Sequence, residues 1–564
     1  MISRRQFLTR TIRLGLAAPL LAGCVAQTAA PAAPVATAPA AASEPQLQTG
    51  GTLTIGVIEE PETLNPLITQ LVTSFNILAG VVDSMLTFDT AQILQPALAE
   101  SYTVAADGLT YTFKLRKNAK WHDGPAFTSA DVKATHDIVM NPDFGAFSQL
   151  GWEKVTDLQT PDDYTVIMKL DTPYAPFLTY VGFGNIVPKH WIDKGVEPFK
   201  SEYGRKPIGT GPFKLSKWES AQFIELDRNP DYWGTPPRLD KIVLKIVPDT
   251  NTLQVQLKTG EVQLTDAVPP RDIEGVKALP NVTVSLIDGT EWTHMDLKYI
   301  DFLMDKRVRQ ALDFATPKAE IVDKLLKGLG TVSFGDQAPG TPYFNPNIEP
   351  RPYDLDKAAA LLTEAGFAKN AQGILEKDGK PLEIEYWVVS GDDAVKQMQQ
   401  VIAASWRKVG IAVDAREENI NSIWGPNGYQ FTQKMTAGQY SWTNGNDPDN
   451  VFYWNSSQIP KDPESTGGNV IAYFNKFSFQ KEIDDLTNAG AAEVDVEKRK
   501  AIYWKIQELL HEEVPVIFLY WGKRIYAAPK NLTGFKPNTY NYLLWDAADW
   551  AFVKMGRSQM SDVR

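Results

Sequence analysis

Short stretches in which apolar and polar residues alternate recur along the chain. This alternation predicts β-strands, because successive side chains of a strand point to opposite faces. The predicted strands are residues 52–58, 111–115, 164–170, 223–226, 242–247 and 282–286. Ala106, Asp107 and Gly108 precede the second of these strands and are residue types that favour a tight turn, so we expect a hairpin there.

Helical periodicity occurs between the strands. Apolar residues spaced three or four apart predict helices over residues 128–140, 354–366 and 394–409. Thr128 is a suitable N-cap for the first helix, and Asp131 completes a capping box three residues later. Gly366 and Gly410 end the other two helices, and residues 411–413 then resume a strand pattern. Helices followed by strands predict a layered α/β architecture.

The amino terminus resembles a bacterial export signal. Residues 1–23 begin with a basic string containing Arg4 and Arg5, which is similar to the twin-arginine signal, and continue into a short apolar run. The run ends in LAGC, which resembles a lipobox, so we expect Cys24 to be lipidated and to become the new terminus. Residues 24–49 are rich in Ala and Pro and predict a tether. We therefore expect an exported protein, periplasmic or on the cell surface, anchored to a membrane through Cys24.

Length and composition limit the classes of function. A chain of 564 residues exceeds the roughly 250–300 at which one core stops growing, so two or more lobes are expected. The formal net charge of −12 argues against nucleic acid as the main partner. Five histidines and one cysteine exclude Cys-rich zinc sites, iron–sulfur clusters and a disulfide framework, and we expect neither a metal nor a cofactor.

Motifs of common catalytic sites are missing from the sequence. It contains no GxSxG, no GxxxxGK[ST] and no GxGxxG pattern. The string that begins at His511 has a proline where a zinc protease has its second histidine, and it predicts the end of a helix before a strand. An enzyme therefore has no positive support in the sequence.

Aromatic residues beside turn residues are the positive signal. Fifteen tryptophans are present, and five of them stand near breakers or strand ends: Trp387, Trp424, Trp442, Trp454 and Trp521. Such rings suit the lining of a ligand cleft, although core packing is the competing interpretation for each of them. Residues 440–450 combine aromatic rings with amides and carboxylates, which suits a loop that contacts a polar ligand.

Several motifs resemble one family in the same order along the chain. They are DGLTYTFKLR (107–116), WHDG (121–124), GTGPF (209–213), RNPDYW (228–233), VRQAL (308–312) and DLDKAAALLTEAGF (354–367). Together they are similar to the peptide/nickel/oligosaccharide class of ABC-importer solute-binding proteins, family 5. The resemblance extends from about residue 50 to about residue 551.

The resemblance implies the large two-lobed α/β periplasmic-binding-protein fold, with an extra domain inserted in the first lobe. Residues 51–92, 206–293 and 524–564 would form the first lobe, 93–205 the inserted domain and 294–523 the second lobe. A ligand would bind between the lobes, and the closed form would dock on an ABC permease. The sequence shows no sign of obligate oligomerisation, so we expect a monomer.

The resemblance also selects candidate ligand contacts. In dipeptide-binding relatives, the loop resembling residues 442–450 carries an aspartate that holds the peptide's amino group. Here the loop is one residue shorter and Asn444 lies nearest that place. The candidate contacts are Trp442, Asn444, Asn446 and Asp447 in the loop, Tyr520 and Trp521 near the return to the first lobe, and Thr69, Gln70 and Thr73 in the first lobe. The aromatic residues Trp424 and Trp387 complete the set.

Alternatives for the ligand remain open. Short peptides are the leading ligand, because they are the commonest in the resembling class. An oligosaccharide is the close rival, since the changed loop and the clustered Trp and Asn suit sugar rings and hydroxyls. Nickel ranks third, because so few histidines are present. A secreted glycoside hydrolase is the alternative from another class.

Overall fold

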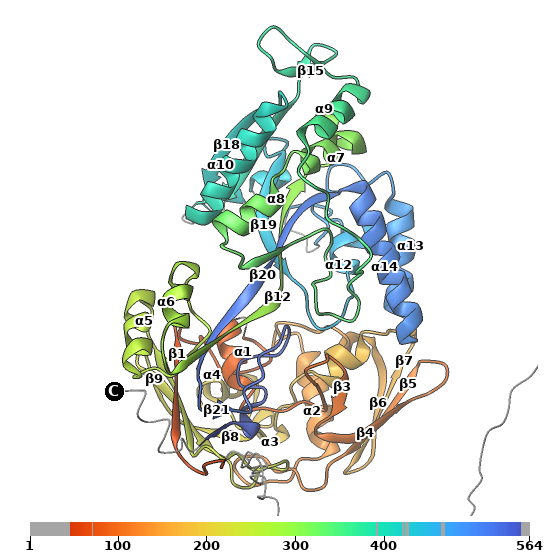
Figure 1. Cartoon of the computed structure of the whole chain (residues 1–564). Coiled ribbons are helices and arrows are strands. Elements are labelled where there is room, and N and C mark those ends of the chain that lie inside the picture. The colour runs from red at the N-terminus through yellow and green to blue at the C-terminus, as the bar shows by residue number, and fades with distance from the viewer. Residues whose placement is uncertain are drawn as a thin grey trace, which may run out of the picture. The chain divides into compact units, whose positions relative to one another are not determined.

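Two long antiparallel strands, β12 (Val282–Leu297) and β20 (Val516–Pro529), run side by side through the middle of a sheet of eleven strands (Figure 1). The computed structural model describes residues 46–69, 71–390, 393–419, 422–423, 428–463 and 468–553. The sheet order is β18 (Ala412–Glu418), β17 (Glu383–Val389), β19 (Ala437–Thr443), β12, β20, β11 (Leu264–Thr265), β1 (Thr52–Val57), β10 (Lys241–Ile246), β9 (Phe223–Arg228) and β8 (Phe213–Glu219), with β13 (Gly330–Val332) beside β20.

Every strand predicted from the alternation is present, with small shifts at the ends. The strand predicted over 282–286 is the exception in length, because it continues to Leu297 as β12. Its register with β20 shifts between Asp288 and Trp292, and the residues after Trp292 are buried on both faces. A bulge and a doubly buried strand both remove the alternation from which a strand is predicted.

A second sheet has four antiparallel strands. Its order is β4 (Ala99–Val104), β5 (Thr110–Leu115), β7 (Thr165–Leu170) and β6 (Val155–Asp162). The predicted hairpin joins β4 to β5: the backbone N–H of Leu109 donates to Asp107 Oδ1, and Gly108 has a φ of +70°. Helix α2 (Ser129–Val139) packs beside this sheet, and its N-cap Thr128 and Asp131 form the predicted capping box.

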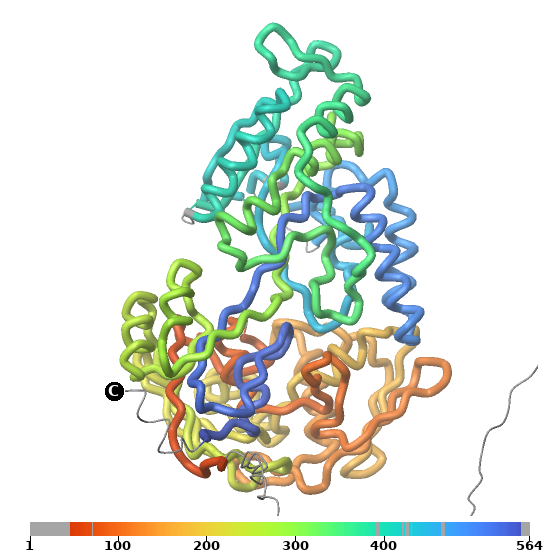
Figure 2. Tube along the Cα trace, viewed as in Figure 1, coloured from red at the N-terminus to blue at the C-terminus, as the bar shows by residue number. Residues whose placement is uncertain are grey.

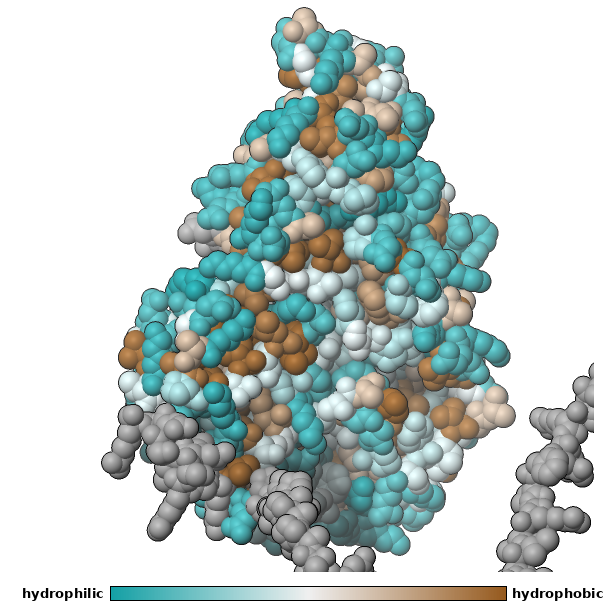
Figure 3. All heavy atoms as spheres, viewed as in Figure 1, coloured by the Kyte–Doolittle hydropathy of each residue, from teal (hydrophilic) through white to brown (hydrophobic). Residues whose placement is uncertain are grey.

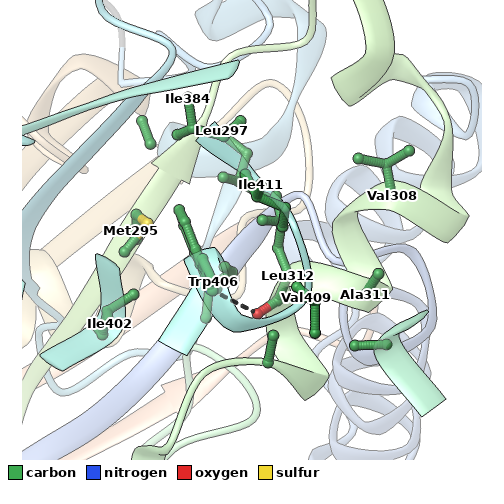
Figure 4. Packing of buried hydrophobic residues seen from close by; sticks show 14 of the residues in the cluster. Met295, Leu297, Val308, Ala311, Leu312, Ile384, Ile402, Trp406, Val409 and Ile411 are labelled. Carbon is green, nitrogen blue, oxygen red and sulfur yellow. Dashed lines mark hydrogen bonds between the residues drawn. The ribbon is translucent and has the colours of Figure 1, made fainter. Parts of the chain in front are cut away.

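The predicted helices in the second half of the chain surround one large core. The predicted helices α9 (Leu355–Glu364) and α10 (Asp393–Lys408) are present; α10 packs on β17 and β18, α9 packs on α7 (Lys306–Phe314), and all three contribute to this core. Figure 4 shows Trp406 of α10 among the aliphatic side chains of this core, with its Nε1 donating to the carbonyl of Leu312 at 3.2 Å. Other α-helices among the described residues are α1 (Val72–Leu78), α3 (Lys189–Ile192), α4 (Val196–Arg205), α5 (Thr250–Thr259), α6 (Ile273–Lys277), α8 (Lys318–Glu320), α12 (Val451–Trp454), α13 (Gln480–Ala492) and α14 (Val496–Glu513).

The GTGPF motif joins three segments by close backbone contact. A Cβ on Gly209 would lie 1.8 Å from the carbonyl oxygen of Val81, so no larger residue fits there. Thr210 Oγ1 donates to Asp83 Oδ2 at 2.8 Å. The backbone N–H of His122 donates to the Gly209 carbonyl at 2.8 Å, and desolvation lowers the pKa of its partly buried ring to about 4. The motif is therefore structural at this place.

Hydrophobic residues gather in separate cores along the chain. One core combines residues from 53–82, 213–264 and 526–552, another lies within 85–186, and two more lie within 292–521. Figure 2 shows the chain passing between these groups along β12 and β20. The described residues belong to one compact unit, so the boundaries predicted above for the lobes and the inserted domain remain predictions. None of the described helices combines the length and apolar character needed to span a membrane.

Candidate ligand-binding site

Trp442, near the end of β19, lies within a group of stacked rings. Its ring stacks on Tyr453 at 4.5 Å and meets Trp292 edge-on at 5.1 Å. Across the strands, Trp292 is the register partner of both Trp442 and Trp521. Trp442 keeps part of its surface exposed, whereas Trp292 is fully buried. The loop is therefore fixed at its start by an aromatic cluster.

Both polar atoms of the Asn444 side-chain amide form hydrogen bonds within the protein. Its Oδ1 accepts a hydrogen bond from Trp292 Nε1 at 2.9 Å, and its Nδ2 donates to the carbonyl of Asp336 at 2.5 Å. Asp336 Oδ2 in turn accepts from Trp454 Nε1 and from Asn450 Nδ2. Asn444, which lies nearest the place expected for an ammonium-binding aspartate, thus holds the loop in place through these hydrogen bonds.

Asp447 forms a buried ion pair. Its two carboxylate oxygens accept from the two terminal nitrogens of Arg499 at 2.6 and 2.8 Å. Burial disfavours the charged guanidinium, but the charge of Asp447 and its hydrogen bonds, with smaller contributions from neighbouring groups, together outweigh burial and raise the pKa of Arg499. Asp447 Oδ1 also accepts from the backbone N–H of Asp449, and Thr179 Oγ1 reaches Oδ2 at 3.4 Å. Burial, together with the neighbouring Asp447 charge, raises the pKa of Asp449 to about 6.

Two of the candidate tryptophans lie in cores. Trp387 of β17 is 1% exposed, stacks on Tyr429 at 4.4 Å and packs in a small cluster with Ile423 and Met435. Trp521 is 1% exposed and meets Phe334 and Phe344 edge-on. Both rings have protein partners on their faces and edges, which leaves little surface for a ligand.

The other candidates are spread around the same region. Tyr520 packs partly buried against the core of α7 and α10, whereas Trp442 packs against the core that contains Trp292. In the first-lobe segment, the buried Thr69 donates through Oγ1 to Glu62 at 2.6 Å, and Thr73 Oγ1 donates to Glu59 at 3.3 Å. Gln70, Trp424 and Cys24 lie outside the described residues.

A cavity of about 360 Å³ opens beside the loop. Gly445 and Asn446 contribute to its wall, and Asn446 is the candidate residue that the structure places on this cavity. The other walls come from three further parts of the chain: Pro66, Leu67, Phe75, Leu78, Ala79, Val82, Asp83, Ser84, Leu86, Thr87 and Ala97; Val139, Phe147, Ser148, Leu150, Trp152, Thr179, Tyr180, Phe183, Gly184 and Asn185; Tyr542 and Trp545.

The cavity wall is mostly apolar and aromatic. Phe75 of α1 stacks on Tyr542 at 5.1 Å, which brings together residues 467 positions apart in sequence. Phe147 and Leu150 leave 56% and 52% of their surface exposed. The face shown in Figure 3 is largely hydrophilic, with scattered apolar patches. Sequence patterns did not indicate these residues, because they come from distant segments with no shared motif.

One carboxylate lies on the cavity wall. Asp83 Oδ2 accepts from Thr210 Oγ1 at 2.8 Å and from Trp233 Nε1 at 2.7 Å, and burial raises the pKa of Asp83 to about 6. The Nδ2 of Asn446 is buried and has no hydrogen-bond partner among the described residues. The described residues contain no group of three or more His, Cys, Asp or Glu side chains arranged to hold a metal ion.

Comparison with known proteins identifies the family. Residues 94–462 match the model of "Bacterial extracellular solute-binding proteins, family 5 Middle". The oligopeptide-binding protein AppA of Bacillus subtilis (strain 168) is 29% identical over 522 residues, covering 88% of this chain and 92% of AppA. The dipeptide-binding protein of Escherichia coli (strain K12) is 29% identical over 459 residues, covering 75% of this chain and 80% of that protein.

The fold agrees with the sequence match. The structure of Bacillus subtilis AppA in complex with a nonapeptide superimposes with a TM-score of 0.72 at 27% identity, covering 90% of this chain and all of that one. The predicted family and two-lobed fold are thereby confirmed, and the hydrolase alternative is wrong. This chain belongs to the bacterial extracellular solute-binding proteins of family 5, which serve ABC importers and bind a solute without catalysing a reaction.

Proposed function

We propose that this protein captures short peptides in the cavity between residues 66–97, 139–185 and 445–446 and delivers them to an ABC permease. The observation that carries the proposal is this cavity of about 360 Å³, which reaches the range of about 300–1,000 Å³ typical of small-ligand sites. Two relatives that match over most of the chain are named for oligopeptide and dipeptide binding. With the predicted boundaries, a loop of the second lobe would meet residues of the first lobe and of its inserted domain at this cavity, so movement of the lobes would open and close it.

The oligosaccharide alternative loses part of its motivation. It relied on tryptophan faces for stacking on sugar rings, and Trp387 and Trp521 have their rings buried in protein cores. Trp442 keeps part of its surface exposed, so the ligand screen described below includes oligosaccharides beside peptides.

Membrane anchoring is proposed from the sequence. The lipobox-like LAGC places Cys24 for lipidation, after which the Ala- and Pro-rich residues 24–49 act as the tether. We further propose that the protein works as a monomer, with its lobes and inserted domain bounded as predicted from the family resemblance. A Cys24→Ser variant that still incorporates labelled fatty acid would contradict the anchor.

Thermal unfolding of the purified protein tests the ligand class. A ligand that binds only the folded state stabilises it by about 2.7 kcal/mol at a hundredfold excess over Kd. We expect tri- to pentapeptides to raise the unfolding temperature and cello-, xylo- and manno-oligosaccharides to leave it unchanged. A response to sugars alone would overturn the peptide proposal.

A further inference from the structure

Hydroxyl groups on the cavity wall differ in whether a protein acceptor already binds them. Ser84 Oγ donates to a backbone carbonyl at 2.7 Å, and Thr179 Oγ1 donates to Asp447 at 3.4 Å. The phenol hydroxyls of Tyr180 and Tyr542, which line the same cavity, donate to no acceptor among the described residues. In ligand sites, a small number of such polar groups fix the orientation of the ligand, so these two hydroxyls are available donors.

Tyr542 is held in place by its ring and its backbone. The ring stacks on Phe75 of α1, with the centroids 5.1 Å apart and an angle of 16° between the planes. The backbone N–H of the next residue, Leu543, donates to Asn76 Oδ1 at 2.9 Å, which joins the same segment to α1 a second time. The Tyr542 hydroxyl is therefore not needed to position its own side chain.

Tyr180 is positioned on another part of the wall by the helical turn Leu178–Gly182. Phe177, just before the turn, and Val181, within it, are fully buried in the core that lies within residues 85–186. The Tyr180 ring stacks on Tyr174, with the centroids 6.4 Å apart and an angle of 19° between the planes. Apolar contacts thus fix this ring as well, and its hydroxyl remains available.

Both hydroxyls stay protonated over the physiological pH range. Burial raises the pKa of Tyr542 above its usual value. Burial also raises the pKa of Tyr180, and the nearby carboxylates of Asp447 and Asp449 raise it further. A protonated phenol donates to an oxygen acceptor, and a peptide presents such acceptors because each of its peptide bonds carries a carbonyl oxygen.

We infer that Tyr180 and Tyr542 recognise the main chain of a bound peptide by donating hydrogen bonds from their hydroxyls to its peptide carbonyl oxygens. This inference rests on the proposed peptide-binding function and names the side chains that bind the ligand backbone. Because all peptides share that backbone, these two contacts supply affinity without selecting one side chain.

Calorimetric titration of the purified protein with Ala-Phe-Ala tests the two donors. We expect Tyr180→Phe and Tyr542→Phe each to weaken binding about three- to tenfold, because each variant removes one neutral hydrogen bond. The unfolding temperature without peptide should stay unchanged, since neither hydroxyl has a partner among the described residues. Tyr102→Phe is the matched control: this partly buried tyrosine of β4 lies outside the cavity lining, so the affinity should stay at the wild-type value.

The outcomes separate the inference from the proposed function. Wild-type affinity in both cavity variants would overturn the inference while leaving the proposed function standing. An equal loss of affinity in Tyr102→Phe, or a lowered unfolding temperature in the two cavity variants, would also overturn it, because either result would indicate a structural effect. If the wild-type protein binds no tri- to pentapeptide, the proposed function fails and the inference fails with it.

Thioamide analogues of Ala-Phe-Ala test the acceptor on the ligand. Sulfur accepts hydrogen bonds more weakly than oxygen, so replacing one peptide carbonyl oxygen at a time should weaken binding to the wild type. For the carbonyl that Tyr180 or Tyr542 binds, the loss should be smaller in the matching Tyr→Phe variant, which lacks the donor. Equal losses in the wild type and in both variants, with each of the two analogues, would overturn the inference.

Discussion

Asp447 and Arg499 form a two-pronged ion pair, with oxygen–nitrogen distances of 2.6 and 2.8 Å, directly beside the loop residue that lines the ligand cavity. Both side chains are nearly inaccessible, at 3% and 6% exposure. Arg499 Nε also donates to the Gly490 carbonyl at 2.8 Å, so the pair ties the loop to α13 and α14. The acidic residue that resembled a ligand contact in the sequence thus has a structural partner of its own.

Removing one member of this pair should destabilise the protein strongly. Asp447→Asn leaves the Arg499 guanidinium buried without its counter-charge, and we expect a loss of about 3–5 kcal/mol in the free energy of unfolding in urea. The double variant Asp447→Asn, Arg499→Met removes both charges and should recover part of that loss. Equal stability of the Asp447→Asn variant and the wild type would contradict the ion pair.

Asp83 should make stability depend on pH. Burial raises its folded-state pKa from 3.8 to about 6, so its contribution is fully present below pH 4 and is lost as pH rises through about 6. Asp83→Asn lacks this titration and keeps an oxygen for Thr210 and Trp233. Relative to this variant, the wild type should lose about 2–3 kcal/mol of unfolding free energy between pH 4 and pH 7. Parallel stability curves for the two proteins would contradict the assignment.

Gly209 should tolerate no side chain. Its Cβ would lie 1.8 Å from the Val81 carbonyl oxygen, and the nearest atoms all belong to the backbone of Val81 and Val82, which cannot move aside as a flexible side chain could. We expect Gly209→Ala to lower the unfolding free energy by at least about 3 kcal/mol. The matched control is Gly275→Ala in α6, where no atom lies within 4 Å, and it should be neutral or slightly stabilising. Similar urea midpoints for the two variants would refute the packing argument.

Strands β12 and β20 each contain a glycine, and the two positions differ in the space available for a side chain. A Cβ on Gly289 in β12 would lie 2.9 Å from the Gly522 carbonyl, whereas a Cβ on Gly522 in β20 meets nothing within 4 Å. Gly289→Ala should therefore cost about 1–3 kcal/mol more stability than Gly522→Ala, measured by denaturant unfolding. A larger loss of stability in Gly522→Ala than in Gly289→Ala would contradict the packing of β12 against β20 described here.

Local elements were predictable from the sequence because their signals are local. Thr128 and Asp131 lie three residues apart and form the capping box of α2, and Gly108 takes the positive φ that its turn requires. The helix that contains His511 ends at Glu513 before β20, as expected. Each of these features depends on neighbours within about four residues.

The candidate site was less predictable because distant segments build it. Asn446 was a candidate from the composition of its loop, but Phe75 and Tyr542 meet only after folding. Trp387 and Trp521 stood beside turn residues, yet neighbouring strands and rings enclose them. A single sequence carries no signal that separates a ring lining a cleft from a ring packed in a core.

Photo-cross-linking tests the central claim most directly, because it reports where a peptide sits. A tripeptide with a central benzoylphenylalanine, irradiated with the purified protein and mapped by mass spectrometry, should label segments that line the cavity, such as those containing Phe75, Phe147 and Tyr542. Excess Ala-Phe-Ala, which lacks the photoreactive benzoyl group, should abolish this labelling. Competed labelling confined to segments outside the cavity would contradict the account.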